Sequence, residues 1–139
     1  MTIRSILHPA SRFLLAFIFL ASGAGKVFAF DQTAATMTSV GFPIPTFFLV
    51  GAILIELLAG LGLLLGLGTR YSAAALIVFV VPATIMFHAS FIGDPVTEQE
   101  QVVNTLKNIA IIGGLLKFVA DGGGYFSLDN RFAKREIVI

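Results

Sequence analysis

The segment 49–66, LVGAILIELLAGLGLLLG, constrains the fold more than any other part of the chain. It is long and apolar enough to be a candidate for a helix that crosses the hydrocarbon core of a bilayer. Glu56 is its only charged residue, and a charge at such a position costs about 2.5–3.5 kcal/mol on membrane-insertion scales. Glu56 must therefore have a partner, carry a proton, or lie outside lipid.

The composition indicates an integral membrane protein. The 139 residues are 57% hydrophobic and 12% charged, whereas a soluble domain carries about 25% charged residues. A net charge of +1 gives no indication of nucleic-acid binding. The chain has no cysteine and only two histidines, so disulfides, cysteine-held iron–sulfur clusters and c-type haem attachment are excluded. We expect no metal site and no intrinsic cofactor.

Hydrophobic segments separated by polar or glycine-rich connections predict a single all-α domain over residues 1–139, a bundle of four transmembrane helices. The helices are expected at about residues 9–30, 45–66, 71–91 and 102–119. Pro9 and Pro45 stand where proline favours a helix start. Residues 31–44 are expected to form a loop, with or without a short interfacial helix, and 93–101 an acidic loop. A short charged tail begins at Asp129.

The first span has a competing interpretation as a cleaved signal peptide, because small residues occur at Ala21-Ser22-Gly23. The apolar periodicity continues through that site, which favours a helix retained in the protein.

The charge distribution predicts that both termini are cytoplasmic. Cytoplasmic loops of membrane proteins are enriched in Lys and Arg. In this orientation the inner side holds seven basic residues: Arg4, Arg12, Arg70, Lys117, Arg131, Lys134 and Arg135. The outer side holds Asp31, Asp94, Glu98 and Glu100, with Lys26 and Lys107 at the outer ends of the first and fourth spans.

This orientation brings polar residues of all four spans into the outer half of the bilayer: Lys26, Glu56, His88, Asn104, Lys107 and Asn108. Small residues mark close helix contacts in membranes, and Gly23, Gly60 and Gly114 lie on the same helix faces as this polar set. We therefore expect Glu56 to pair with Lys26 or Lys107 in an outward-facing cavity that also holds His88.

Three interpretations of this polar set remain open. It can bind a small molecule or move a proton, since ionisable residues inside a membrane are usually functional. It can be an ion pair that only fixes the helix register. Alternatively, the lysines extend outward to the interface.

A second polar group is predicted at the inner side, where Arg12, Arg70, Asp121 and Asp129 lie at similar depth. Arg12 paired with Asp121 or Asp129 would be a structural clamp between the first span and the end of the fourth. Segment 122–124, Gly-Gly-Gly, follows a helix and opens none, so it indicates a turn rather than a phosphate-binding loop.

Several local patterns, taken in order, resemble the DoxX family over residues 12–131. They are Gly23-x-x-Lys26, Glu56-x-x-x-Gly60 with Leu63 and Gly66, Thr69-Arg70 with Ala73-Ala74, Phe87-His88-Ala89-Ser90-Phe91, Lys107-Asn108, and Gly122-x-Gly124-Tyr125-x-Ser127-Leu128-Asp129. One departure is Gly123, where the family commonly has proline.

The resemblance implies a small four-helix protein of the bacterial inner membrane. The family takes its name from a subunit of an archaeal thiosulfate:quinone oxidoreductase, and its members are often labelled oxidoreductases, but it has no agreed catalytic residues to transfer to this chain. We expect a redox-associated membrane subunit whose cavity receives a quinone headgroup or a small oxidant as substrate, with a partner redox subunit or as a homo-oligomer. The alternative is a permease for a small solute or protons, or a non-enzymatic accessory protein. Whether the chain is an enzyme stays open.

Overall fold

Four long helices and two short ones form the computed structural model, which describes residues 2–88 and 95–136, with side chains for 2–86 and 98–133. The helices are α1 (Ile3–Phe28), α2 (Phe30–Ser39), α3 (Pro45–Leu65), α4 (Thr69–His88), α5 (Pro95–Asp121) and α6 (Leu128–Glu136). No strand occurs in these ranges. By length and composition α1, α3, α4 and α5 can each cross a membrane, which confirms the expected all-α class with four spans.

Two of the long helices begin earlier than expected. α1 starts at Ile3 and contains Pro9, which lacks the N–H that would donate to the carbonyl of Ser5 and so removes one backbone bond from the second turn. α5 starts at Pro95, so most of the segment expected as an acidic loop is helical. Proline is favoured in the first turn of a helix, and Glu98 there suits the helix dipole.

The connections also contain more helix than expected. α2 occupies much of the segment between the first two spans, and α6 forms in the charged tail. The hydroxyl of Ser127 accepts a hydrogen bond from the backbone N–H of Asn130 at 3.2 Å, which satisfies one free donor at the start of α6. The end of the third expected span, beyond His88, lies outside the described residues.

The α1–α3 interface depends on glycine. A Cβ added at Gly23 would lie 2.9 Å from Leu57 Cδ2, and one at Gly60 would lie 3.1 Å from Leu20 Cδ2. Gly114 of α5 is similarly close to α1, 3.0 Å from Leu15 Cδ1. All three glycines predicted at helix contacts therefore occupy them. α1 continues through Ala21-Ser22-Gly23 without a break.

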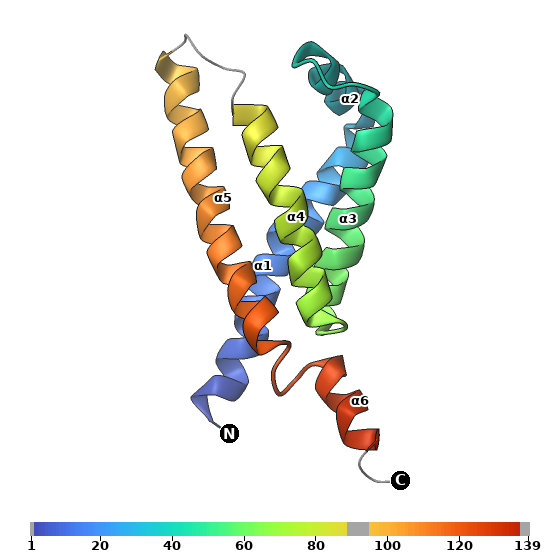
Figure 1. Cartoon of the computed structure of the whole chain (residues 1–139), viewed down its shortest axis with the longest axis vertical. Coiled ribbons are helices and arrows are strands. Elements are labelled where there is room, and N and C mark those ends of the chain that lie inside the picture. Colours follow the sequence, from blue (N-terminus) through green and yellow to red (C-terminus); the bar gives the residue numbers. More distant parts are fainter. Residues whose placement is uncertain (1, 89–94, 137–139) are drawn as a thin grey trace.

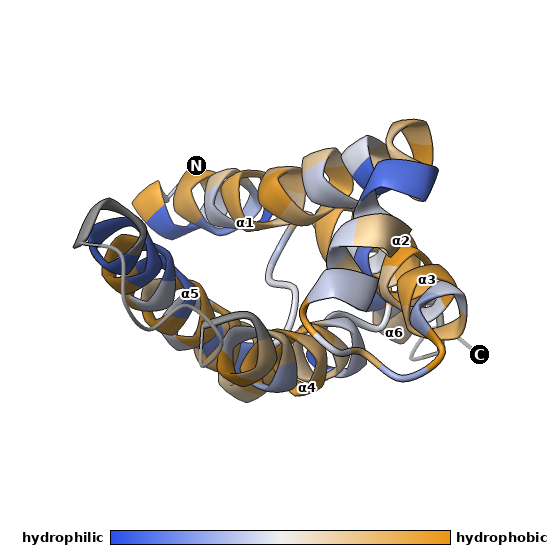
Figure 2. Cartoon of the chain, turned by 90° about the horizontal axis from the view of Figure 1, so that it is seen from above, coloured by the Kyte–Doolittle hydropathy of each residue, from blue (hydrophilic) through white to orange (hydrophobic). Residues whose placement is uncertain are grey.

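α1 and α5 meet near one end of the bundle and diverge toward the other (Figure 1). The start of α1 and α6 share the closed end, and α2 lies at the open end. Viewed from the α2 end, α1 lies opposite α4 and α5, with α3 at the side (Figure 2). Buried residues fill the middle of the bundle: Ala16, Phe19, Leu63, Leu76, Leu115 and Phe118.

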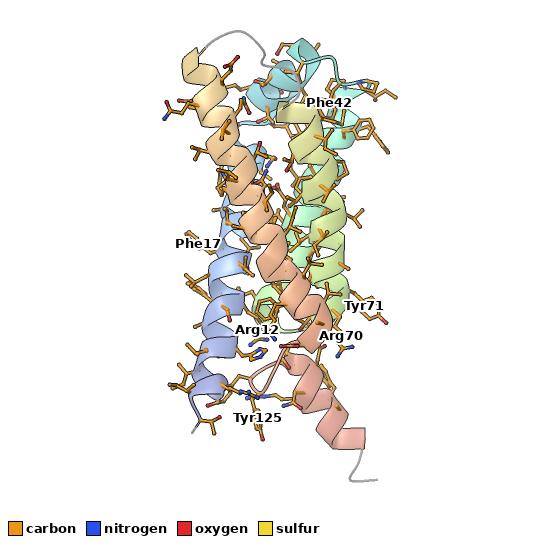
Figure 3. All side chains as sticks on the ribbon, turned by 60° about the vertical axis from the view of Figure 1, so that its left-hand side comes forward. Arg12, Phe17, Phe42, Arg70, Tyr71 and Tyr125 are labelled. Atoms are coloured by element: carbon orange, nitrogen blue, oxygen red, sulfur yellow. The ribbon has the colours of Figure 1, made fainter. Side chains whose placement is uncertain are left out.

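The outer faces of the long helices are apolar. Phe17, Leu58 and Val78 are 62, 66 and 71% exposed, and Phe17 projects away from the bundle (Figure 3). A continuous apolar surface of this kind is expected where lipid is the solvent.

Candidate functional site: a charged cavity between four helices

Glu56 of α3 forms an ion pair with Lys26 of α1. Lys26 Nζ lies 2.8 Å from Glu56 Oε2 and 3.1 Å from Oε1. The Glu56 side chain is 4% exposed and that of Lys26 is 26% exposed. Of the two partners considered from the sequence, the structure pairs Glu56 with Lys26 and not with Lys107.

Ser22 completes this pair. It precedes Lys26 by four residues, so the two side chains lie on one face of α1. Its hydroxyl donates to Glu56 Oε1 at 3.0 Å and accepts from Lys26 Nζ at 2.6 Å. The buried carboxylate therefore accepts three hydrogen bonds, two of them from a cation, which offsets the cost of removing it from water. In the sequence Ser22 stands out only as a small residue, and its part in the ion pair depends on the packing of α1 against α3.

α5 contributes a second group of polar side chains. Lys107 Nζ donates to Asn104 Oδ1 at 3.1 Å, and Asn108 Nδ2 donates to the hydroxyl of Thr84 on α4 at 2.8 Å. Thr84 in turn donates to the carbonyl of Val80 at 2.7 Å. The Asn108 amide is thus held in a fixed orientation between α5 and α4.

Both groups line one cavity of about 410 Å³ between α1, α3, α4 and α5. Its polar lining consists of Ser22, Lys26, Glu56, Asn104, Lys107 and Asn108. The structure thus brings together five of the six residues predicted for the site. The sixth, His88, lies outside the residues whose side chains are described.

The charges in this cavity do not cancel. Lys26 neutralises Glu56, whereas Lys107 has only the Asn104 amide as a hydrogen-bond partner within the described side chains. Among the described side chains the lining therefore holds two lysines and one carboxylate, an excess of one positive charge, and it presents N–H donors, an arrangement that favours an electronegative or anionic ligand.

At the closed end the predicted clamp forms differently from the expectation. Arg12 is 3% exposed and donates from Nη2 to the carbonyl oxygen of Phe126 at 2.9 Å. Neither Asp121 nor Asp129 makes an ion pair with Arg12 within 4.0 Å, although the charges of Arg12 and Asp129 still interact over a longer distance. Gly66 makes room for the guanidinium, because any Cβ there would overlap Arg12 Nη1.

Asp129 instead caps α4. Its carboxylate accepts from the backbone N–H of Gly68 at 2.6 Å, and from the N–H and hydroxyl of Thr69 at 2.9 and 2.8 Å. Burial raises the pKa of Asp129, but these hydrogen bonds and the charge of Arg12 outweigh burial and hold that pKa below its usual range. A carboxylate that caps a helix from sixty residues away leaves no sequence signature.

Asp121 and Arg70 take no part in the Arg12 contact. Asp121 pairs with Lys117, four residues earlier on α5. Arg70 lines a cavity of about 540 Å³ beside the glycine turn. Arg12, Arg70 and Tyr125 all lie toward the closed end (Figure 3). The four residues predicted for the inner side therefore lie toward one end of the bundle but do not form a common ion pair.

Comparison with known proteins identifies the family. The DoxX family model matches residues 9–89. The inner membrane protein YphA of Escherichia coli (strain K12) is 31% identical over 130 residues, which cover 92% of this chain and 91% of that protein. The inner membrane protein YqjF of the same organism is 30% identical over 125 residues, covering 90% and 91%. No solved structure gives a significant match. Together with its four spans, these matches establish that the chain is a multi-pass protein of the bacterial inner membrane and belongs to the DoxX family.

Proposed function

We propose that the cavity at Lys26, Glu56 and Lys107 binds the headgroup of a quinone or a similar small oxidant, and that the chain acts as a redox-associated membrane subunit. The observation that carries this proposal is the convergence of N–H donors from two sides on one cavity of about 410 Å³. Intramembrane ionisable residues that meet in a cavity are functional-site candidates by default.

The donor arrangement suits a ligand with two carbonyl groups. Lys26 approaches the cavity from α1, and Lys107 and Asn108 approach it from α5. A para-quinone carries carbonyl oxygens at opposite ends of its ring, and each can accept a hydrogen bond from one side. The excess positive charge also stabilises the electron density that those oxygens gain on reduction.

Reduction of a quinone to a quinol takes up two electrons and two protons. The lysine ammonium groups and the Ser22–Glu56 hydrogen bond place exchangeable protons at the cavity wall. In this proposal the chain supplies protons, and the electrons come from a partner redox subunit.

A permease for a small solute or protons is the second candidate. α1 and α5 diverge toward the α2 end, which favours access of a solute to the cavity from that end. However, the fully buried side chains of Leu63, Leu76 and Leu115 fill the bundle between the cavity and the Arg12 end. Because this apolar layer offers no polar path, the geometry supports binding better than passage.

Binding of a water-soluble quinone headgroup to the purified protein in lipid nanodiscs tests the proposal. The probe is 2,3-dimethoxy-5-methyl-1,4-benzoquinone, followed by calorimetry. Lys107→Met removes one charged donor, a change worth about 1.5–3 kcal/mol, and should weaken binding about tenfold or more. Lys117→Met is the matched control, because Lys117 lies outside the cavity lining and should leave binding unchanged.

Equal affinity for Lys107→Met and Lys117→Met would contradict the proposal. Solute or proton flux in proteoliposomes distinguishes the second candidate. Flux that is abolished by Glu56→Ala would favour the permease over the redox subunit.

A further inference from the structure

A second cavity of about 280 Å³ lies between α2, α3 and α4, and its lining is apolar. Its main side chains are Met37, Phe42, Leu49, Phe79, Pro82 and Met86. Thr33 is one of the few polar groups in the lining, and its hydroxyl already donates to the carbonyl of Ala29 at 2.8 Å. No unsatisfied polar group is described there, and such a cavity favours an apolar occupant over water.

The apolar cavity adjoins the charged one. Lys26, Phe79 and Ala83 line both of them. The ammonium of Lys26 contacts Glu56, and a lysine also has an apolar methylene stem that can line an apolar surface. The two cavities therefore meet at a boundary where the lining changes from charged to apolar.

We infer that the ligand is amphipathic, with a hydrogen-bond-accepting head in the charged cavity and one apolar chain that passes Phe79 and Ala83 into the cavity beneath α2. This inference rests on the proposed function and narrows its substrate class. It assigns a lipid-borne molecule, such as a quinone with an alkyl or isoprenoid chain, and excludes a small water-soluble oxidant as the natural ligand.

Two features of the lining indicate that an apolar chain of the ligand, rather than a second polar group, occupies the apolar cavity. The lining combines residues of four helices, α1 to α4, with Phe42 of the connection before α3. Leu49 is fully buried and Met37 is 5% exposed, whereas Phe47 and Val78 of the same lining are 70 and 71% exposed. The cavity therefore has an inner wall of protein and an open side through which a chain can enter from the lipid. An apolar chain that fills this space gains contacts in proportion to the area it buries.

Gly51 provides a sharp test. It lines the apolar cavity, and a Cβ added there would meet nothing within 4 Å. Gly51→Leu therefore places its Cβ in open space, adds side-chain volume at the wall of this cavity and raises helix propensity. Gly113 of α5 also has open space at its Cβ but lines neither cavity, so Gly113→Leu is the matched control. Gly51→Ala adds a single methyl group and gives a graded second variant.

The experiment compares two probes in nanodiscs, the chainless benzoquinone used above and the same headgroup with a decyl chain. Gly51→Leu should lower the affinity for the decyl probe at least tenfold and leave the affinity for the chainless probe within twofold of the parent value. Gly51→Ala should lower the affinity for the decyl probe by an intermediate factor. Gly113→Leu should change neither affinity. Partition of the decyl chain into lipid is the same for all variants, so it cancels from the comparison.

Unchanged binding of the decyl probe to Gly51→Leu would overturn the inference, as would an equal loss for both probes. A bound phospholipid that native mass spectrometry detects in the parent protein and not in Gly51→Leu, together with unchanged decyl binding, would assign the cavity to bilayer lipid and also overturn it. Failure of the proposed function looks different, because the chainless probe would then not bind the parent protein or would not respond to Lys107→Met.

Discussion

Lys26 donates to both carboxylate oxygens of Glu56, at 2.8 and 3.1 Å, yet the two side chains differ in exposure, 26% against 4%. The acid is enclosed and the base lies at the cavity wall. Loss of the lysine should therefore affect stability differently from loss of the acid, because only the lysine can move its charge toward water when its partner is removed.

Lys26→Met should destabilise the protein more than Glu56→Gln. Removing the lysine leaves an enclosed carboxylate, and breaking a buried pair in this way costs about 3–5 kcal/mol. Glu56→Gln keeps an acceptor for Ser22, and Lys26 can extend outward, so a cost of about 1–2 kcal/mol is expected. Reversible unfolding in mixed micelles measures both.

The double variant Lys26→Met/Glu56→Gln is the control for this pair. It should be more stable than Lys26→Met alone, since no charge is left enclosed. Equal destabilisation by the two single substitutions would show that the difference in exposure has no energetic effect.

Stability should fall in acid because of Asp129. Its pKa in the folded state lies below the unfolded value of about 3.9. A lowered folded pKa contributes stability that is complete above the unfolded pKa and is lost as pH falls through the folded pKa. The midpoint temperature of thermal unfolding should therefore fall between pH 6 and pH 2, and it should fall less in Asp129→Asn than in the parent protein.

Asp129→Asn should also lose about 0.5–2 kcal/mol at neutral pH, the usual range for loss of a helix cap. Asp31→Asn, at an exposed position on α2, is the matched control and should retain the parent decline in acid. The same acid profile for the parent protein and Asp129→Asn would contradict the capping role.

Gly66→Ala should be clearly destabilising, whereas Gly25→Ala should not. Gly66 has a φ of 68°, where an L side chain is disfavoured, and a Cβ there would overlap Arg12. A cost above about 1–2 kcal/mol is expected from the backbone alone. Gly25 lies inside α1 with nothing near its Cβ, so alanine should stabilise the helix by up to about 1 kcal/mol. Chemical unfolding of the two variants measures the difference, and a Gly66→Ala protein as stable as the parent would refute the close contact with Arg12.

The orientation in the membrane is a prediction from charge, and labelling can test it. Because the chain has no cysteine, a maleimide can label only the cysteine that is introduced. Gln32→Cys, on α2, should react with an impermeant maleimide in intact spheroplasts. Phe132→Cys, on α6, should react only after permeabilisation. The reverse pattern would place both termini outside.

The spans and the acid–base pair of the fold follow from the sequence for clear reasons. An apolar run cannot be satisfied in water, and an acid inside such a run needs a basic partner, so Glu56 predicted Lys26 as one of two candidates. Glycine spacing predicted the contacts at Gly23, Gly60 and Gly114. Residue type alone predicts these features, because a membrane makes an unpaired charge costly and favours small residues where helices pack closely.

The contacts at the closed end of the bundle could not be predicted in the same way. Arg12 and Asp129 are opposite charges at similar depth, which suggests an ion pair. In the structure Arg12 donates to a backbone carbonyl, and Asp129 accepts from backbone N–H groups. Every residue carries such backbone groups, so only the path of the chain decides which of them is near. The start of α1 before Pro9 differs from the expectation as well, because a proline favours a helix start but does not exclude helix before it.

The contact between Arg12 and Phe126 joins the first span to the chain just before the final helix. The segment matched by the family model, residues 9–89, includes Arg12 but not its acceptor. It likewise includes the start of α4 but not Asp129. That segment alone therefore lacks the partners that hold Arg12 and the start of α4. A protein shortened before Gly122 would leave one guanidinium enclosed without its carbonyl and one helix without its cap, so the glycine turn and the residues after it belong to the core of the fold.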